Sequence, residues 1–136
     1  MIVFVSDDGN PVRIPATDIA HLLGQESSLR LVVLNSCDGA RGNAKDDLSS
    51  TAGTIIRGGT PAVVAMQYEI SDSAAREFSR SFYEGIAAGL PVEAAVAQGR
   101  DGIAAELNDA LEWGTPVLYS RAPDNVLFAL PRATPA

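Results

Sequence analysis

An aliphatic run reaches a polar turn in the stretch Leu31-Val32-Val33-Leu34-Asn35-Ser36-Cys37-Asp38-Gly39. An uncharged run rich in valine and leucine is typical of a strand buried on both faces, as in a parallel sheet. The only cysteine of the chain stands at the polar end of this run and not inside it. In open parallel sheets, ligands and chemistry collect beyond the carboxyl ends of the strands. The pattern therefore singles out Cys37 as a candidate functional residue.

Strand-like and helix-like segments alternate along the chain. Strands are predicted over residues 2–6, 12–14, 30–36, 61–67, 115–120 and 125–130. Helices are predicted over residues 17–23 with Thr17 as N-cap, 48–57, 73–88, and from Pro91 along an apolar seam to Leu111 with a break near Gly102. The first two strands form a hairpin. The remaining alternation predicts an α/β fold with a mostly parallel sheet, helices on both faces and the 30–36 strand at its centre.

Length, charge and cysteine content argue against several classes of protein. The 136 residues suit one domain, expected over residues 1–130 with a disordered tail at 131–136. The formal charge of −7 is unsuited to the phosphate backbone of nucleic acid. No segment resembles a membrane span or a signal peptide, and one cysteine with one histidine cannot build a usual zinc site. We therefore expect a cytoplasmic protein without cofactor, metal, nucleic-acid partner or membrane contact.

Cys37 admits two interpretations. The common role of a lone cysteine is that of a small, half-buried hydrophobe. A thiol just past a strand end and followed by Asp38-Gly39 can instead expose its sulfur. Backbone N–H groups around the glycine can then approach a carbonyl oxygen, as an oxyanion hole requires. In this second interpretation Cys37 is a catalytic nucleophile and Gly39 forms the oxyanion turn.

Cys37-Asp38-Gly39 after an aliphatic strand is similar to the Cys-x-Gly of caspases. Together with other blocks of the chain, it resembles CHAT domains, the bacterial caspase-like peptidases, over about residues 2–130. The resemblance implies a caspase-like fold and a cysteine endopeptidase, a hydrolase that acts on peptide or protein substrates. The blocks that carry it are residues 3–12, 31–37, 58–65, Asp72 at a helix start, Phe82-Tyr83-Glu84 with Gly89, and residues 113–119.

The main departure from the family concerns the catalytic base. Peptidases of this type pair the cysteine with a histidine, because an unassisted thiol is only a few per cent thiolate at neutral pH. In caspases that histidine precedes the cysteine by about 50 residues. Counted back from Cys37, it falls before Met1. We therefore expect the carboxyl-terminal part of a CHAT domain, lacking the His-Gly segment and inactive in isolation.

The only histidine, His21, is not expected to substitute for that base. It lies two residues from Ile19, about 200° around the predicted helix, so it points away from the apolar face and toward water.

Candidate substrate-binding residues follow the predicted strand at 61–67. Gln67 and Tyr68 stand where the family often has a tryptophan after the strand. Asp72 has two interpretations, a helix N-cap or a specificity residue beyond the strand end. Gln67, Tyr68 and Asp72 are thus expected to line the substrate site.

Three hypotheses follow from these residues. In the first, the chain is part of a cysteine endopeptidase in which Cys37 attacks a peptide carbonyl and residues absent from the chain supply the base. In the second, it is a pseudo-peptidase that keeps the fold as a protein-interaction or signalling module. In the third, it is an unrelated α/β binding protein with a structural cysteine. We prefer the first.

The family resemblance also predicts an unpaired sheet edge. In a complete domain, the 30–36 strand pairs on one side with the strand that carries the histidine. Without that neighbour its backbone forms an edge lined with Leu31 and Val33, which invites pairing with another chain. We therefore expect the isolated chain to form homo-oligomers, or to need the upstream half of the domain as a second chain.

Overall fold

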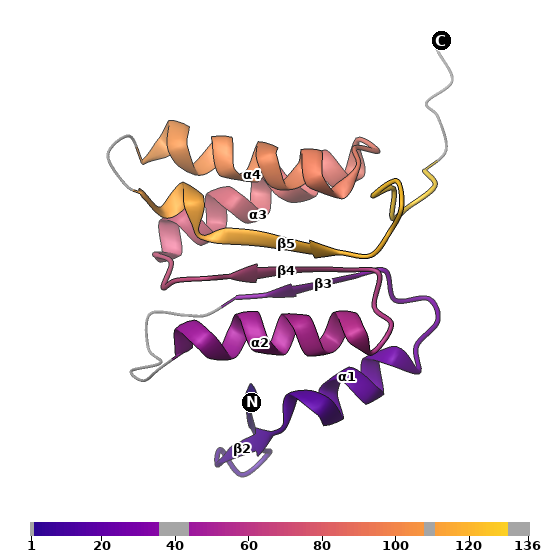
Figure 1. Ribbon diagram of the computed structural model, residues 1–136. Coiled ribbons are helices and arrows are strands. Elements are labelled where there is room, and N and C mark those ends of the chain that lie inside the picture. The colour runs from indigo at the N-terminus through magenta and orange to yellow at the C-terminus, as the bar shows by residue number, and fades with distance from the viewer. Residues whose placement is uncertain (1, 36–43, 108–110, 131–136) are drawn as a thin grey trace.

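A three-stranded sheet lies between two layers of helices in the computed structural model, which describes residues 2–35, 44–107 and 111–130 (Figure 1). In this sheet β4 (Ala62–Met66) lies between β3 (Leu31–Leu34) and β5 (Pro116–Ser120). A separate hairpin pairs β1 (Ile2–Val5) with β2 (Pro11–Ile14). The predicted hairpin and the predicted strands over 61–67 and 115–120 are confirmed within two residues of their expected bounds.

Helices cover both faces of the sheet, as predicted. They are α1 (Ala16–Gly24), α2 (Ala44–Arg57), α3 (Asp72–Ala87) and α4 (Val92–Glu106). Because side chains alternate along a strand, β4 sends Ala62, Val64 and Met66 into the core formed with α3 and α4. Val63 and Ala65 enter the core formed with α1 and α2. All five residues of β4 are buried, which accounts for its uncharged sequence.

The sheet is mixed, so the expectation of a mostly parallel sheet is not met within the described part of the chain. β3 and β4 are parallel, whereas β4 and β5 are antiparallel. The reason lies in the connections. One helix, α2, returns the chain from the end of β3 to the start of β4. Two helices, α3 and α4, stand between β4 and β5, so the chain re-enters the sheet at the carboxyl end of β4.

α3 and α4 pack closely because glycines of α4 face side chains of α3. A Cβ added at Gly99 would lie 2.6 Å from the ring of Phe78. One added at Gly102 would collide with the hydroxyl of Ser81. Gly102 is therefore a contact point inside a continuous helix, and the predicted break there is wrong.

Several further expectations are corrected. α2 begins at Ala44, four residues before the predicted start at residue 48, because its first turn is polar and lacks the apolar spacing used to find it. Residues 125–130 form no strand, since Asn125 has a left-handed φ of 55° that turns the chain. Leu111 is 86% exposed on a separate 3₁₀ turn, η1 (Leu111–Gly114), and does not extend the seam of α4. Pro15, not Thr17, precedes the first residue of α1.

β3 is at one edge of the sheet and not at its centre. Its four residues are half-buried, in contrast to the fully buried β4. Within the described residues β4 is its only partner.

Candidate active site

The candidate site lies at the carboxyl ends of β3 and β4. Because these strands are parallel, both end at the same side of the sheet. β5 starts there, since Pro116 pairs with Met66. Figure 1 shows η1 and the first turn of α3 at this same end. The sheet therefore brings the segments that follow β3 and β4 together with those that precede β5.

Cys37 and Gly39 lie outside the described residues. The structure follows β3 as far as the exposed Asn35, and Cys37 comes two positions later. The place of Cys37 at the site and the role of Gly39 therefore stay predictions.

Gln67 joins two segments of the site. Its backbone N–H donates a hydrogen bond to the carbonyl oxygen of Thr115, at 2.9 Å. The N–H of Thr115 in turn donates to the carbonyl oxygen of Glu112, also at 2.9 Å. Gln67 follows β4, and Thr115 precedes β5. The two bonds therefore link the segment after β4 to the segment before β5. The Gln67 residue itself is half-buried, and Tyr68 beside it is 49% exposed.

Ser71 is the N-cap of α3, so the prediction that Asp72 caps this helix is wrong. The Ser71 hydroxyl oxygen accepts a hydrogen bond from the N–H of Ala74 at 3.2 Å. Asp72 is instead the first residue of the helix and is exposed to solvent. Its carboxylate stands where the helix dipole favours negative charge. The structure thus gives Asp72 a place at the candidate site, and its substrate contact stays a prediction.

Glu112 is the residue of this region that the sequence did not identify. Its Oε1 accepts a hydrogen bond from the backbone N–H of Ser71 at 2.6 Å, and its Oε2 accepts one from the Ser71 hydroxyl at 3.0 Å. In a capping box a glutamate three residues after the N-cap accepts from that N–H. Ala74 occupies this position, so a carboxylate 41 residues away takes the role. The sequence indicates only that the Ser71 N–H has no local side-chain acceptor, and it does not point to Glu112.

Large apolar side chains are exposed around this end of the sheet. Leu111 is 86% exposed and Trp113 is 48% exposed, both on η1. Together with Tyr68 they come from the two connections that Gln67 and Thr115 join by hydrogen bonding. Exposed apolar side chains concentrated at one place are typical of a binding surface.

His21 is exposed to solvent, as expected, and lies beside the last turns of α2. It belongs to α1, and its Nε2 is 2.9 Å from Nε2 of Gln25. It lines a groove together with Thr54 and Arg57 of the last turns of α2. Position 54 is about 15 Å along the helix axis from Ala44, the first residue of α2 after the Cys37 segment. His21 therefore lies beside the end of α2 that is remote from Ala44.

The described residues contain neither a metal-binding cluster nor a membrane-spanning helix. No group of three or more His, Cys, Asp or Glu side chains in residues 2–35, 44–107 and 111–130 is arranged to hold a metal ion. Among the same residues, no helix is both long enough and apolar enough to cross a membrane.

The sequence was compared with protein families, curated proteins and solved structures. The family model of the CHAT domain matches residues 2–129. No significant match was found among curated proteins or among solved structures.

Proposed function

The chain belongs to the CHAT domain family, which is related to the caspase-like peptidases, and on this basis we propose that it carries the nucleophile-bearing part of a cysteine endopeptidase. One observation supports the proposal most. The two parallel strands β3 and β4 end side by side, and in the sequence the family's Cys-x-Gly begins three positions after Leu34, the last residue of β3. This is the crevice in which open α/β sheets carry out chemistry.

In the proposed reaction, the Cys37 thiolate attacks the carbonyl carbon of a peptide bond. A histidine supplied by another polypeptide segment removes the thiol proton and passes it to the leaving amine. Backbone N–H groups near Gly39 stabilise the oxyanion of the tetrahedral intermediate. Water then hydrolyses the thioester, which releases the acid product and restores the thiol. The chain alone lacks this base, so we expect no turnover from it.

Gln67, Tyr68 and Asp72 are proposed to bind the substrate beside Cys37. Their backbone is held from two directions, because Gln67 is bonded to Thr115 and the start of α3 is bonded to Glu112. A peptide bound across the carboxyl ends of β3 and β4 would therefore meet a fixed surface. Such fixed surfaces limit the entropy lost on binding.

The missing half of the proposed site is expected to pair with β3. β3 has a free edge within the described chain, and its residues Leu31–Leu34 are only half-buried. We propose that the upstream half of the domain, or a second chain, covers this side and brings the histidine.

A pseudo-peptidase is the alternative function, and the position of His21 favours it. The only histidine of the chain lies beside the last turns of α2 and has Gln25 as its partner. If no histidine reaches Cys37 from another polypeptide, the exposed side chains of Tyr68, Leu111 and Trp113 would serve partner binding alone.

A labelling experiment distinguishes the two functions. The chain is mixed with an upstream CHAT segment that carries the His-Gly strand, and a peptidyl acyloxymethyl ketone is added. A peptidase gives an adduct on Cys37 and peptide hydrolysis, and both are lost in Cys37→Ala. Binding of the upstream segment without an adduct or hydrolysis would reject the peptidase and leave the interaction module.

A further inference from the structure

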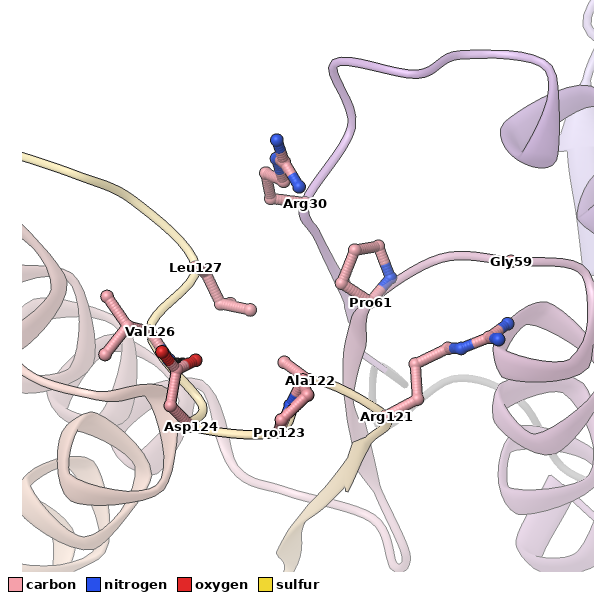
Figure 2. Close-up of a pocket in the computed structure, with 9 residues that line it drawn as sticks. All are labelled: Arg30, Gly59, Pro61, Arg121, Ala122, Pro123, Asp124, Val126 and Leu127. Atoms are coloured by element: carbon pink, nitrogen blue, oxygen red, sulfur yellow. Dashed lines mark hydrogen bonds between the residues drawn. The ribbon is translucent and has the colours of Figure 1, made fainter.

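A cavity of about 300 Å³ opens at the other end of the sheet, away from the candidate active site. It lies where β3 and β4 begin and β5 ends, between Arg30, Pro61 and the segment after Ser120 (Figure 2). Its volume is at the lower end of the range of about 300–1,000 Å³ found for small-ligand sites. None of the residues proposed for the peptidase site lines it.

The outer wall of this cavity is fixed by hydrogen bonds. Arg121 extends the pairing of β5, because its N–H donates to the carbonyl oxygen of Pro61 at 2.9 Å. The chain then turns at Asn125, whose carbonyl oxygen accepts from the N–H of Val92 at 2.8 Å. The N–H of Val126 donates to Oδ1 of Asp124 at 3.1 Å. The cavity is therefore preformed, although residues 121–127 form no helix or strand.

Two arginines line the cavity. Figure 2 shows Arg30 and Arg121 on opposite sides of Pro61, with the side chain of Arg121 extending toward Gly59. The guanidinium of Arg30 has no hydrogen-bond or ion-pair partner in the described part of the chain. The guanidinium of Arg121 donates one hydrogen bond, from Nη1 to the carbonyl oxygen of Ile56 at 3.3 Å. A guanidinium has five N–H donors, so both arginines keep donors for a ligand.

The remaining walls are largely apolar. Val126 is 47% exposed and Leu127 is buried, and both lie across the cavity from Pro61 (Figure 2). Asp124 is the one carboxylate in the lining, and one of its oxygens is already engaged by the N–H of Val126. Gly59 has a φ of +115° and open space where a Cβ would be, so a ligand can approach its backbone.

From these features we propose that the cavity binds a carboxylate carried on a short apolar stem. The planar guanidinium fork matches a carboxylate, and the proline, valine and leucine side chains match the stem. Two sources share this chemistry: a small aliphatic acid, and the carboxyl terminus of a peptide that ends in an aliphatic residue. The small volume admits only the last one or two residues of such a peptide.

Amide NMR of the 136-residue chain tests the proposal with three probes. They are 4-methylpentanoate, acetyl-Ala-Val-Leu with a free carboxylate, and the same peptide as its carboxamide. We expect saturable shifts at Gly59 and Ala122 with at least one carboxylate, no such shifts with the carboxamide, and unchanged signals at Gln67 and Trp113. The carboxylate that binds identifies the source. No shift with either carboxylate at about 10 mM would overturn the proposal, since even millimolar affinity would then be absent.

Charge-removing variants test the role of the arginines. Arg30 is exposed and precedes β3, so Arg30→Gln is expected to fold normally and to weaken carboxylate binding by about tenfold or more. Arg76→Gln, at an exposed position of α3, is the matched control and is expected to change nothing. Equal weakening by both variants would mean non-specific attraction and would reject the site. Arg121→Gln is a second variant, whose folding is checked because it also loses the bond to Ile56.

Discussion

The carboxylate of Glu112 accepts hydrogen bonds from both donors of Ser71, with its two oxygens 2.6 Å from the Ser71 backbone nitrogen and 3.0 Å from the hydroxyl oxygen. This contact connects η1 to the first residues of α3 across 41 positions of sequence. The hydroxyl donates to Glu112 and accepts from Ala74 at the same time. The start of α3 at the candidate substrate site is therefore held by a long-range contact, in addition to the bond between Gln67 and Thr115.

Replacing Glu112 by alanine should destabilise the protein by about 1–3 kcal/mol, because a partly buried N–H then loses its charged acceptor. Glu112→Gln keeps one carbonyl oxygen and should cost less. Urea unfolding measures both changes. Glu106→Gln, at an exposed residue on the last turn of α4, is the control and should change stability little. A stability loss for Glu112→Ala no larger than the control's would mean that water replaces the carboxylate.

Because α3 and α4 pack closely, an alanine at Gly99 should lower the stability of the protein, whereas helix propensity alone predicts that it raises it. Alanine normally stabilises a helix relative to glycine by up to about 1 kcal/mol. At Gly99 the new Cβ would lie 2.6 Å from the buried ring of Phe78, so Gly99→Ala should destabilise by about 1–3 kcal/mol through overpacking. Gly114→Ala has nothing within 4 Å of the added Cβ and serves as the control. A thermal unfolding midpoint for Gly99→Ala at or above that of the parent would contradict the packing.

Local patterns in the sequence predicted those elements whose periodicity reflects burial. β4 is an unbroken apolar run because both of its faces are covered, and α3 repeats Phe78 and Phe82 on its buried side. What failed depends on distant contacts. The antiparallel direction of β5 follows from two consecutive helices, and the capping role of Glu112 depends on a fold that brings it to Ser71. Residues 125–130 have a strand-like pattern, but Asn125 has a left-handed φ that the apolar pattern does not predict.

Cys37 should react with iodoacetamide like an ordinary, accessible thiol. The chain offers it no imidazole, because His21 is beside the last turns of α2. Its alkylation rate should therefore rise with pH around the ordinary thiol value of about 8.5. Mass spectrometry of the tryptic peptide gives the rate at each pH. Rapid alkylation near about pH 6 would show that another group activates the thiol.

His21→Ala should leave the alkylation rate of Cys37 unchanged. The side chain is exposed and is bonded to Gln25, so its loss should also change stability little. Circular dichroism verifies the fold of the variant before the rates are compared. A clear fall in Cys37 reactivity in the folded variant would mean that His21 reaches the thiol, within one chain or between two.

The free edge of β3 should make the isolated chain associate. β3 pairs only with β4 among the described residues, and its aliphatic side chains are half-buried, whereas those of β4 are buried. Backbone groups on such an edge, next to apolar side chains, form a template for another strand. Sedimentation velocity at several concentrations should show dimers or larger species. An added upstream segment carrying the His-Gly strand should replace them with a one-to-one complex.

Hydrogen exchange supplies the local readout, because the β3 amides should exchange faster than those of β4 in the free chain and slow down in that complex. A monomer at every concentration that ignores the segment, with β3 amides as protected as those of β4, would show that the edge needs no partner.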